Sequence, residues 1–338
     1  QEGLIIPPPR LYHAGQPDVA LHAMIARNVR IPDVVMGDLR AQIAAGNVGK
    51  RRMLTMFEEY SKDAVLAGLA ELMDRAEAMT RRELEQIPDG SYSFADYLDN
   101  DGIDMDKRIK VCVTVTIKGS NLHADFTGSS PQVKGPFNSV PSSTMSAVYY
   151  MVRAVTDPTI PNNAGCYRPV TLHLPEGSIV NPRPPAPVNS RTATIKRIAD
   201  VLLGALVKAA PQRLPAASSG QLLVMFMGGI DPTTGRPYVT SELGGGGMGA
   251  RPSKDGIDAV ETDVTNCMNI PAEAIEMEHP IRVLKSSLRN GSAGAGRYRG
   301  GLGLEKVFEL VRGQATVTYR GERHHTQPWG LFGGLPAE

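Results

Sequence analysis

Hydrophobic residues recur at helical spacing through two stretches in the first quarter of the chain. Between Pro32 and Tyr60 the apolar positions mostly follow the period of a helix, and Pro32 suits its first turn. Gly46 and Gly49 are expected to break or bend this helix, because glycine weakens a helix interior. The stretch from Lys62 to Gln86 keeps a stricter period with charges on the opposite face, and Pro88-Asp89-Gly90 then supplies a turn. Two long helices are therefore predicted.

Alternating apolar and polar residues predict antiparallel strands farther along the chain. Lys110–Ile117 alternates and is rich in β-branched residues, and Leu122–Phe126 follows after a Gly-Ser turn, which indicates a hairpin. A second strand pair is expected on either side of the turn at Asp231–Gly235. Its strands are Leu222–Met227 and Pro237–Leu243, and short strands dominate from Ile281 onward, including Val307–Leu310 and Ala315–Tyr319.

Further helices are predicted between these strands, at Ser139–Val155 and at Thr192–Val207, the second after a proline-rich linker. The segment Leu4–Asn28 holds four prolines and is expected to be extended or turning, and Pro169–Val180 is expected to be extended. The fold class predicted is α+β, a mixed irregular architecture with antiparallel strands and several long helices. Residues 1–100 are expected to form a helical N-terminal region, and residues 101–338 a mixed region with a glycine-rich loop.

Composition narrows the class of protein. The chain is 41% hydrophobic and 21% charged, as in an ordinary globular protein, and its net charge of +1 offers no electrostatic footprint for nucleic acid or an anionic membrane. Its three cysteines are widely spaced and odd in number, which argues against a disulfide framework and favours the cytoplasm. No apolar run approaches the roughly 20 residues that a transmembrane helix needs.

A glycine-rich run, Gly244 to Gly247 with Gly249, stands out in the C-terminal part. Glycine permits positive φ and close approach of the main chain to a ligand or another chain. The run satisfies the dinucleotide-binding pattern only literally, because a loop containing Pro252 and Gly256 follows where a helix would be needed. No Gly-Lys-Ser or Gly-Lys-Thr triplet follows either, which excludes a P-loop.

Several separated motifs around this run resemble the hydantoinase B/oxoprolinase family. They are Glu2–Pro8, Gly37–Gln42, Asp125–Ser130, Gly244–Gly247, Ala250–Pro252, Asp255–Gly256, Thr265–Asn266, Asn269–Glu273, Glu278–Arg282, Gly294–Gly303 and Pro328–Gly334. They occur in the family's order and span nearly the whole chain.

The resemblance implies a subunit or fragment of an ATP-dependent hydrolase of cyclic amides such as hydantoin or 5-oxoproline. A partner ATPase resembling hydantoinase A would phosphorylate the amide oxygen, and the enzyme is expected to be a hetero-oligomer. ATP and a divalent metal are expected in the complete enzyme, with neither bound by this chain, because relatives carry their metal ligands in a part that precedes the segment matched by Gln1. The chain is therefore expected to be a fragment or a processed piece that needs a missing N-terminal segment or chain. A subunit of an acetone- or acetophenone-type carboxylase and a non-catalytic assembly subunit remain open as alternatives.

Candidate site residues lie within and after the glycine-rich run. Glu276 and His279 would share a face of a helical turn, where they could act as a general base or form a surface ion pair. Asn266 and Asn269 could hydrogen-bond the carbonyl and N–H edges of a polar ring, or serve as turn residues, as could Thr262, Asp263 and Thr265.

Cationic and thiol groups supply weaker candidates. Arg191, with Lys196 and Arg197, opens the predicted helix at Thr192 and could meet a phosphate or carboxylate, although a solvated helix face is the more ordinary interpretation. Cys267 could be a nucleophile, or a small buried hydrophobe. Seven histidines include no H-x-x-x-H or H-E-x-x-H pattern, so no metal site is predicted from this chain's own residues.

Overall fold

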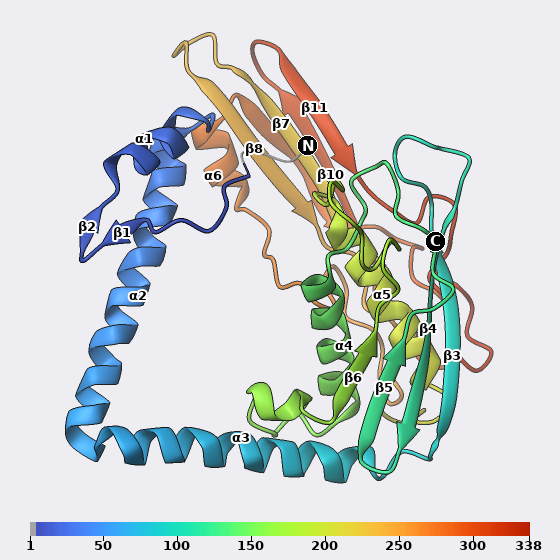
Figure 1. The fold of residues 1–338 in the computed structure, drawn as a ribbon. Coiled ribbons are helices and arrows are strands. Elements are labelled where there is room, and N and C mark those ends of the chain that lie inside the picture. Colours follow the sequence, from blue (N-terminus) through green and yellow to red (C-terminus); the bar gives the residue numbers. More distant parts are fainter. Residues whose placement is uncertain (1–4) are drawn as a thin grey trace. The chain divides into compact units, whose positions relative to one another are not determined.

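The computed structural model describes residues 5–338 (Figure 1). Glu2, Gly3 and Leu4, which begin the motif Glu2–Pro8 and the segment predicted to be extended, lie outside the described part. The chain divides into two compact units, Gln1–Arg75 and Ala76–Glu338. This division differs from the predicted boundary after residue 100, because the strand at Gly90–Leu98 pairs with the strand at Ile109–Lys118 inside the second unit. The mixed α+β fold class is confirmed.

The first unit is built mainly of helices. A small hairpin, β1 (Tyr12–His13) with β2 (Gln16–Pro17), precedes α1 (Val19–Arg27), which was not predicted. The side chain of Asp18 caps α1 by accepting the backbone N–H of Leu21 at 2.9 Å. The predicted long helix is α2 (Pro32–Tyr60).

Gly46 and Gly49 do not interrupt α2, contrary to the prediction. Both are exposed, and a glycine in a helix costs only about 1 kcal/mol relative to alanine, which is too little to end a helix of this length. The break comes instead at Ser61, where φ is +68°, and α3 (Lys62–Leu84) follows and runs from the first unit into the second. The predicted second helix is thus confirmed to within two residues of its end.

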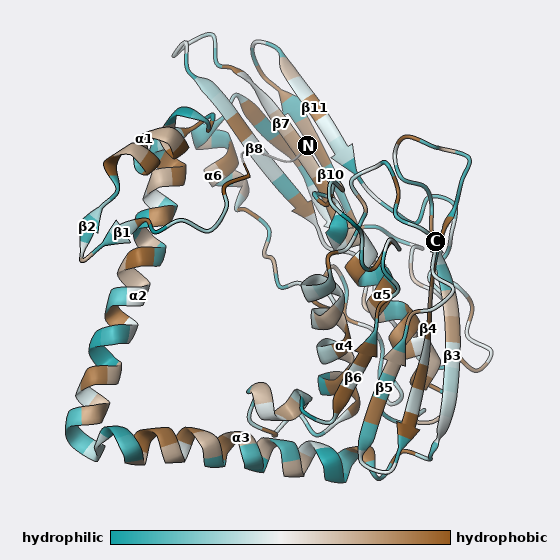
Figure 2. Ribbon diagram, in the orientation of Figure 1, coloured by the Kyte–Doolittle hydropathy of each residue, from teal (hydrophilic) through white to brown (hydrophobic). Residues whose placement is uncertain are grey.

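The second unit contains a four-stranded sheet in the order β3 (Gly90–Leu98), β4 (Ile109–Lys118), β5 (Asn121–Asp125), β6 (Val170–His173). The predicted hairpin is the antiparallel pair β4 and β5, whereas β5 and β6 run parallel. Alternation in β4 buries every second residue, from Ile109 through Ile117, on one face of the sheet. Figure 2 shows these apolar positions in brown.

Helix α5 (Arg191–Leu206) packs against β3 and β4, and α4 (Pro141–Val155) packs against α5, all within one hydrophobic core. Nearly all of α5 is buried, including Lys196, Arg197 and Asp200. The solvated face predicted for the start of this helix is therefore wrong for Lys196 and Arg197. Charged residues so deeply buried need partners, and their partners shape the site described below.

The rest of the second unit consists of two smaller sheets and long irregular segments. One sheet has the order β11 (Ala315–Arg320), β7 (Leu223–Ile230), β8 (Pro237–Gly244), and the other pairs β9 (Ile281–Leu288) with β10 (Leu304–Leu310). Helix α6 (Ala272–Glu278) and a short 3-10 turn, η1 (Ala164–Tyr167), complete the elements. Among residues 5–338, no helix combines the length and apolar character needed to cross a bilayer.

Candidate functional site

The glycine-rich run begins where β8 ends and continues as extended main chain through the second unit. Gly246 forms a bridge with Val260. The Met248 N–H donates to the Ile257 carbonyl at 2.9 Å, and the Met248 carbonyl accepts from Gly301 at 2.8 Å. Segments distant in the sequence are thus joined through backbone hydrogen bonds on both sides of the run.

Close packing explains why these positions are glycine. A Cβ atom on Gly246 would lie 2.1 Å from the Cβ of Ser219, and one on Gly247 would lie 1.9 Å from the carbonyl oxygen of Gly301. Neither residue has positive φ, so these two positions use the small size of glycine and not its access to left-handed backbone. The close approach that glycine permits is made to other segments of this same chain.

One face of the run borders a hollow of about 300 Å³, which we call the asparagine hollow. It brings together three predicted site residues, Gly245, Asn266 and Asn269. Cys267 also lines it and is exposed, so its interpretation as a buried hydrophobe is wrong. The remaining lining residues are Leu243, Ala259, Val260, Glu261 and Met268.

Glu261 is a lining residue that the sequence did not single out. Its side chain is only 5% exposed, and neither carboxylate oxygen has a hydrogen-bond partner among residues 5–338. The cation nearest to it is Lys196 on α5, whose Nζ lies 3.6 Å from Oε1 and donates instead to the Thr262 carbonyl at 2.8 Å. A buried carboxylate with free acceptor capacity is suited to bind N–H donors.

Lys306 on β10 reaches the rim of the asparagine hollow. Its ammonium donates to Oδ1 of Asn269 at 2.9 Å and forms an ion pair with Glu242. Asn269 is therefore held in place by a charged donor. Among the other predicted polar groups, Thr262 donates to Asp263 and Thr265 donates to the Thr262 carbonyl, within one loop. Asp263 also accepts the hydroxyl of Ser218, from a distant segment, at 2.9 Å.

The glycine-rich run also lines a second hollow, of about 240 Å³, which we call the serine hollow. Gly244 to Gly247 line it together with Ser218, Ser219, Glu322, Arg323 and His324. Burial raises the pKa of the Glu322 carboxyl to about 7, although the Asp99 backbone N–H, which donates to it at 3.1 Å, opposes this shift. The hydroxyl of Ser219 is buried with no hydrogen-bond partner in the described part of the chain.

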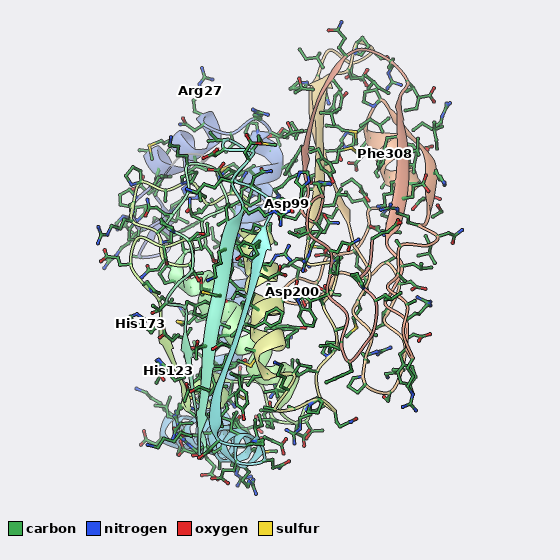
Figure 3. All side chains as sticks on the ribbon, turned by 90° about the vertical axis from the view of Figure 1, so that its right-hand side faces the viewer. Arg27, Asp99, His123, His173, Asp200 and Phe308 are labelled. Atoms are coloured by element: carbon green, nitrogen blue, oxygen red, sulfur yellow. The ribbon has the colours of Figure 1, made fainter. Side chains whose placement is uncertain are left out.

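A buried charge network supports the serine hollow. Arg323 donates to Asp200 at 2.7 Å and lies 3.1 Å from Asp96, to which Arg197 also donates at 2.8 Å. Complete burial raises the pKa of Asp200, and the nearby Arg323 opposes the rise. Figure 3 labels Asp200 on α5 and Asp99 just beyond the end of β3. These contacts fix the strand-to-loop segment that carries Glu322 and Arg323.

Three predicted site residues lie outside the lining of both hollows. Glu276, on α6, accepts the backbone N–H of Val283 at 2.9 Å, and His279 ends the helix and stacks on the ring of Tyr238 at 5.7 Å. Arg191 begins α5, is exposed, and donates to the Val188 carbonyl at 3.4 Å. Their roles in catalysis and binding remain predictions. Across residues 5–338, no three His, Cys, Asp or Glu side chains gather in a way that could hold a metal ion.

Comparison with known proteins supports the family-level interpretation. The model of the hydantoinase B/oxoprolinase family matches residues 1–338. An uncharacterised protein of Methanocaldococcus jannaschii is 37% identical over 98% of this chain, and the putative D-/L-hydantoinase B subunit of Pseudomonas sp. strain NS671 is 35% identical over 98%. Because the match covers 57% of each of these proteins, the chain spans little more than half of their length.

Two solved structures share the fold. The ATP-dependent caprolactamase of Pseudomonas jessenii superposes with a TM-score of 0.84 at 31% identity, covering 91% of this chain and 54% of that chain. A nucleotide-free acetone carboxylase superposes with a TM-score of 0.88 at 19% identity, covering 98% of this chain and 46% of that chain. This likeness shows the fold alone. The family model and the relatives agree with the motifs around the glycine-rich run, and the chain belongs to the hydantoinase B/oxoprolinase family.

Proposed function

We propose that this chain is the B-type part of an ATP-dependent enzyme that hydrolyses cyclic amides together with an A-type ATPase partner. The observation that carries this proposal is the likeness, along 98% of this chain, to a putative hydantoinase B subunit and to the beta subunit of a caprolactamase. Both names denote opening of a ring at an amide bond. The three free cysteines fit the reducing cytoplasm in which we place this enzyme.

In the proposed reaction, activation of the amide by ATP and hydrolysis of the activated ring are separate steps. An amide carbonyl is a poor electrophile, and phosphorylation of its oxygen creates a leaving group for attack by water. No P-loop triplet follows the glycine-rich run, so we assign the use of ATP to the partner protein. The family's divalent metal has no three-residue ligand set among residues 5–338, and we derive no step from it.

We assign recognition of the cyclic amide to the asparagine hollow. The side-chain amides of Asn266 and Asn269 supply both donors and acceptors, which match the alternating C=O and N–H edge of such a ring. The buried carboxylate of Glu261 lacks hydrogen-bond donors and would accept a ring N–H. Gly245 lets the main chain line the hollow without a side chain. Glu276 and His279, predicted as a general base, are not required by this assignment.

The runner-up is a ketone carboxylase subunit, which would use the same activation on a ketone. Its support is the fold shared with acetone carboxylase at 19% identity, which says nothing of the substrate. A non-catalytic assembly role is the third possibility. The names and identities of the hydantoinase and caprolactamase relatives favour ring opening over both.

Reconstitution tests the proposal. The protein would be purified with an A-type ATPase partner and given hydantoin, 5-oxoproline, caprolactam, or acetone with bicarbonate. We expect ring opening of a cyclic amide that depends on ATP. Carboxylation of acetone without ring opening would favour the runner-up, and inactivity on every substrate in a correctly assembled complex would contradict an enzymatic role.

A further inference from the structure

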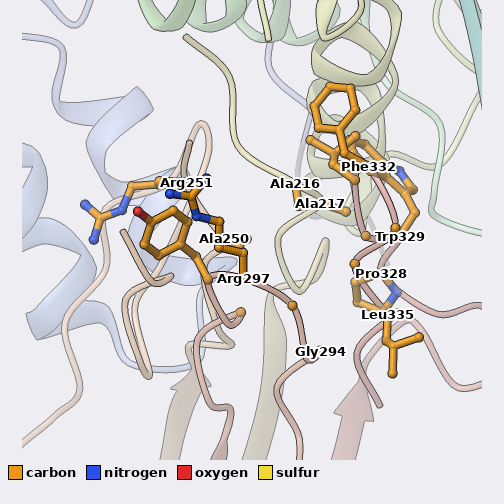
Figure 4. Close-up of a pocket in the computed structure, with 18 of the residues that line it drawn as sticks. Ala216, Ala217, Ala250, Arg251, Gly294, Arg297, Pro328, Trp329, Phe332 and Leu335 are labelled. Carbon is orange, nitrogen blue, oxygen red and sulfur yellow. The ribbon is translucent and has the colours of Figure 1, made fainter. Parts of the chain in front are cut away.

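A third hollow, of about 380 Å³, lies at the far end of the glycine-rich run, and we call it the arginine pocket. Its walls come from Gly249–Pro252, from the loop Gly294–Tyr298 and from the C-terminal loop Pro328–Leu335. Figure 4 shows Arg251 and Arg297 on one side of it and Trp329, Phe332 and Leu335 on the other. The pocket thus has a cationic side and an apolar side.

The cationic side carries uncompensated charge. The lining contains Arg251 and Arg297 but no aspartate or glutamate, and neither arginine forms an ion pair within residues 5–338. Arg251 donates through Nε and Nη2 to the Asp255 carbonyl at 3.0 and 2.7 Å, which orients the guanidinium without neutralising it. The carboxylate of Asp255 is engaged elsewhere, because it accepts the Arg299 N–H at 2.9 Å.

Arg297 is exposed and contacts an aromatic ring, not an anion. Its guanidinium carbon lies 5.5 Å from the centre of the Tyr298 ring. Such a contact leaves the outer N–H groups available to a carboxylate or phosphate. The two guanidinium groups therefore offer a pair of charged donors with no acid of this chain in the lining to occupy them.

The apolar side is firmly built. The Trp329 ring packs against Phe94 with centroids 5.2 Å apart, and Leu214, another lining residue, is only 1% exposed. The Trp329 indole N–H is buried without an acceptor among the described residues, so the apolar wall also carries an unsatisfied donor. Backbone packing holds the surrounding loop, since a Cβ on Gly330 would lie 2.2 Å from the Gly334 carbonyl oxygen. A preformed pocket with these features suits a small ligand of mixed character.

We propose that the arginine pocket binds a small organic anion, a carboxylate attached to an apolar body. The carboxylate lies against Arg251 and Arg297, and the apolar body packs on Trp329. Inorganic anions lack the apolar part, and neutral analogues lack the charge, so both bind more weakly. This site is separate from the asparagine hollow, and its test does not depend on the proposed ring-opening activity.

Fluorescence offers a direct test, because Trp329 is the only tryptophan of the chain. The purified chain would be titrated with 3-phenylpropionate, with its neutral amide 3-phenylpropionamide, and with inorganic phosphate, following tryptophan emission and, independently, the heat of binding. We expect saturable binding of 3-phenylpropionate at least tenfold tighter than that of either comparison compound.

Variants locate the binding. Arg251→Gln and Arg297→Gln should each weaken 3-phenylpropionate about tenfold or more, whereas the exposed Arg236→Gln, outside the pocket, should leave it unchanged. The thermal unfolding midpoint of each variant shows whether it folds. Equal binding of the acid and the amide, binding of phosphate as tight as that of the acid, unchanged binding in both pocket variants, or no saturable binding by either method would each overturn the proposal.

Discussion

Lys196 and Glu261 form an ion pair inside the second unit, with Nζ of the lysine 3.6 Å from Oε1 of the glutamate. The lysine side chain is 0% exposed and the glutamate side chain 5% exposed. Glu261 lines the asparagine hollow, and its pairing with Lys196 links α5 to the loop that carries Asn266 and Asn269. The lysine is satisfied by the Thr262 carbonyl, but the glutamate keeps free acceptor capacity. Glu261 therefore contributes to stability through its ion pair with Lys196, and its free acceptor capacity is available to a ligand.

Lys196→Met should destabilise the chain by about 3 to 5 kcal/mol, because it leaves the Glu261 carboxylate buried and unpaired. Urea unfolding of the variant measures the loss. The exposed Lys208→Met is the matched control and should change the free energy of unfolding by less than about 0.5 kcal/mol. The double variant Lys196→Met with Glu261→Gln should lose less stability than Lys196→Met alone, and a larger loss would contradict the pairing.

Gly246→Ala should destabilise the chain by about 1 to 3 kcal/mol or prevent folding, since the new methyl group would collide with Ser219 at 2.1 Å. Gly46→Ala provides the opposite case, because nothing lies within 4 Å of a Cβ there and α2 continues through it. It should stabilise by about 0.5 to 1 kcal/mol. Thermal unfolding of both variants tests whether Gly246→Ala lowers and Gly46→Ala raises the free energy of unfolding. An unchanged free energy of unfolding in Gly246→Ala would refute the close packing of the run.

Glu322 should make the protein less stable as the pH rises. Burial raises the pKa of its carboxyl from 4.5 to about 7, so the folded state holds the proton more tightly than the unfolded state. The resulting stabilisation is complete below pH ~4.5 and is lost as the pH rises to about 7, by at most about 3 kcal/mol. Glu322→Gln should remove this part of the slope, while the exposed Glu85→Gln should retain it. Identical pH profiles for wild type and Glu322→Gln would contradict the assignment.

Local sequence patterns predicted most of the fold. The period of α3, the alternation of β4 and the strand pair β7 and β8 each follow from neighbouring residues, and all three are confirmed. The parallel pairing of β5 with β6 depends on a long connection, and local alternation contains no information about it. Gly46 and Gly49 do not break α2, because a long helix tolerates the small cost of an exposed glycine.

The site was predicted only in part, for a similar reason. Gly245, Asn266 and Asn269 lie within 25 residues of one another in the sequence, and the structure brings them to one hollow. Glu261 lies close to them in sequence, but its burial beside Lys196 depends on the packing of α5. Glu322, in the C-terminal part of the chain, lines the serine hollow beside the glycine-rich run. Burial of a charged side chain arises from packing between distant segments. Charged residues within an otherwise apolar helix pattern, as at Lys196, are the signal that could have indicated it.

The most direct test of the account is the rate of ATP-dependent ring opening when the asparagine hollow is altered in the assembled enzyme. Asn266→Ala and Asn269→Ala should each lower kcat/KM for the cyclic amide about tenfold or more, because each removes hydrogen bonds to the ring. Asn47→Ala, an exposed asparagine of α2, should not change it, and the thermal unfolding midpoint of each variant shows whether it folds. Wild-type kcat/KM in the double variant Asn266→Ala with Asn269→Ala would contradict the assignment of substrate recognition to this hollow.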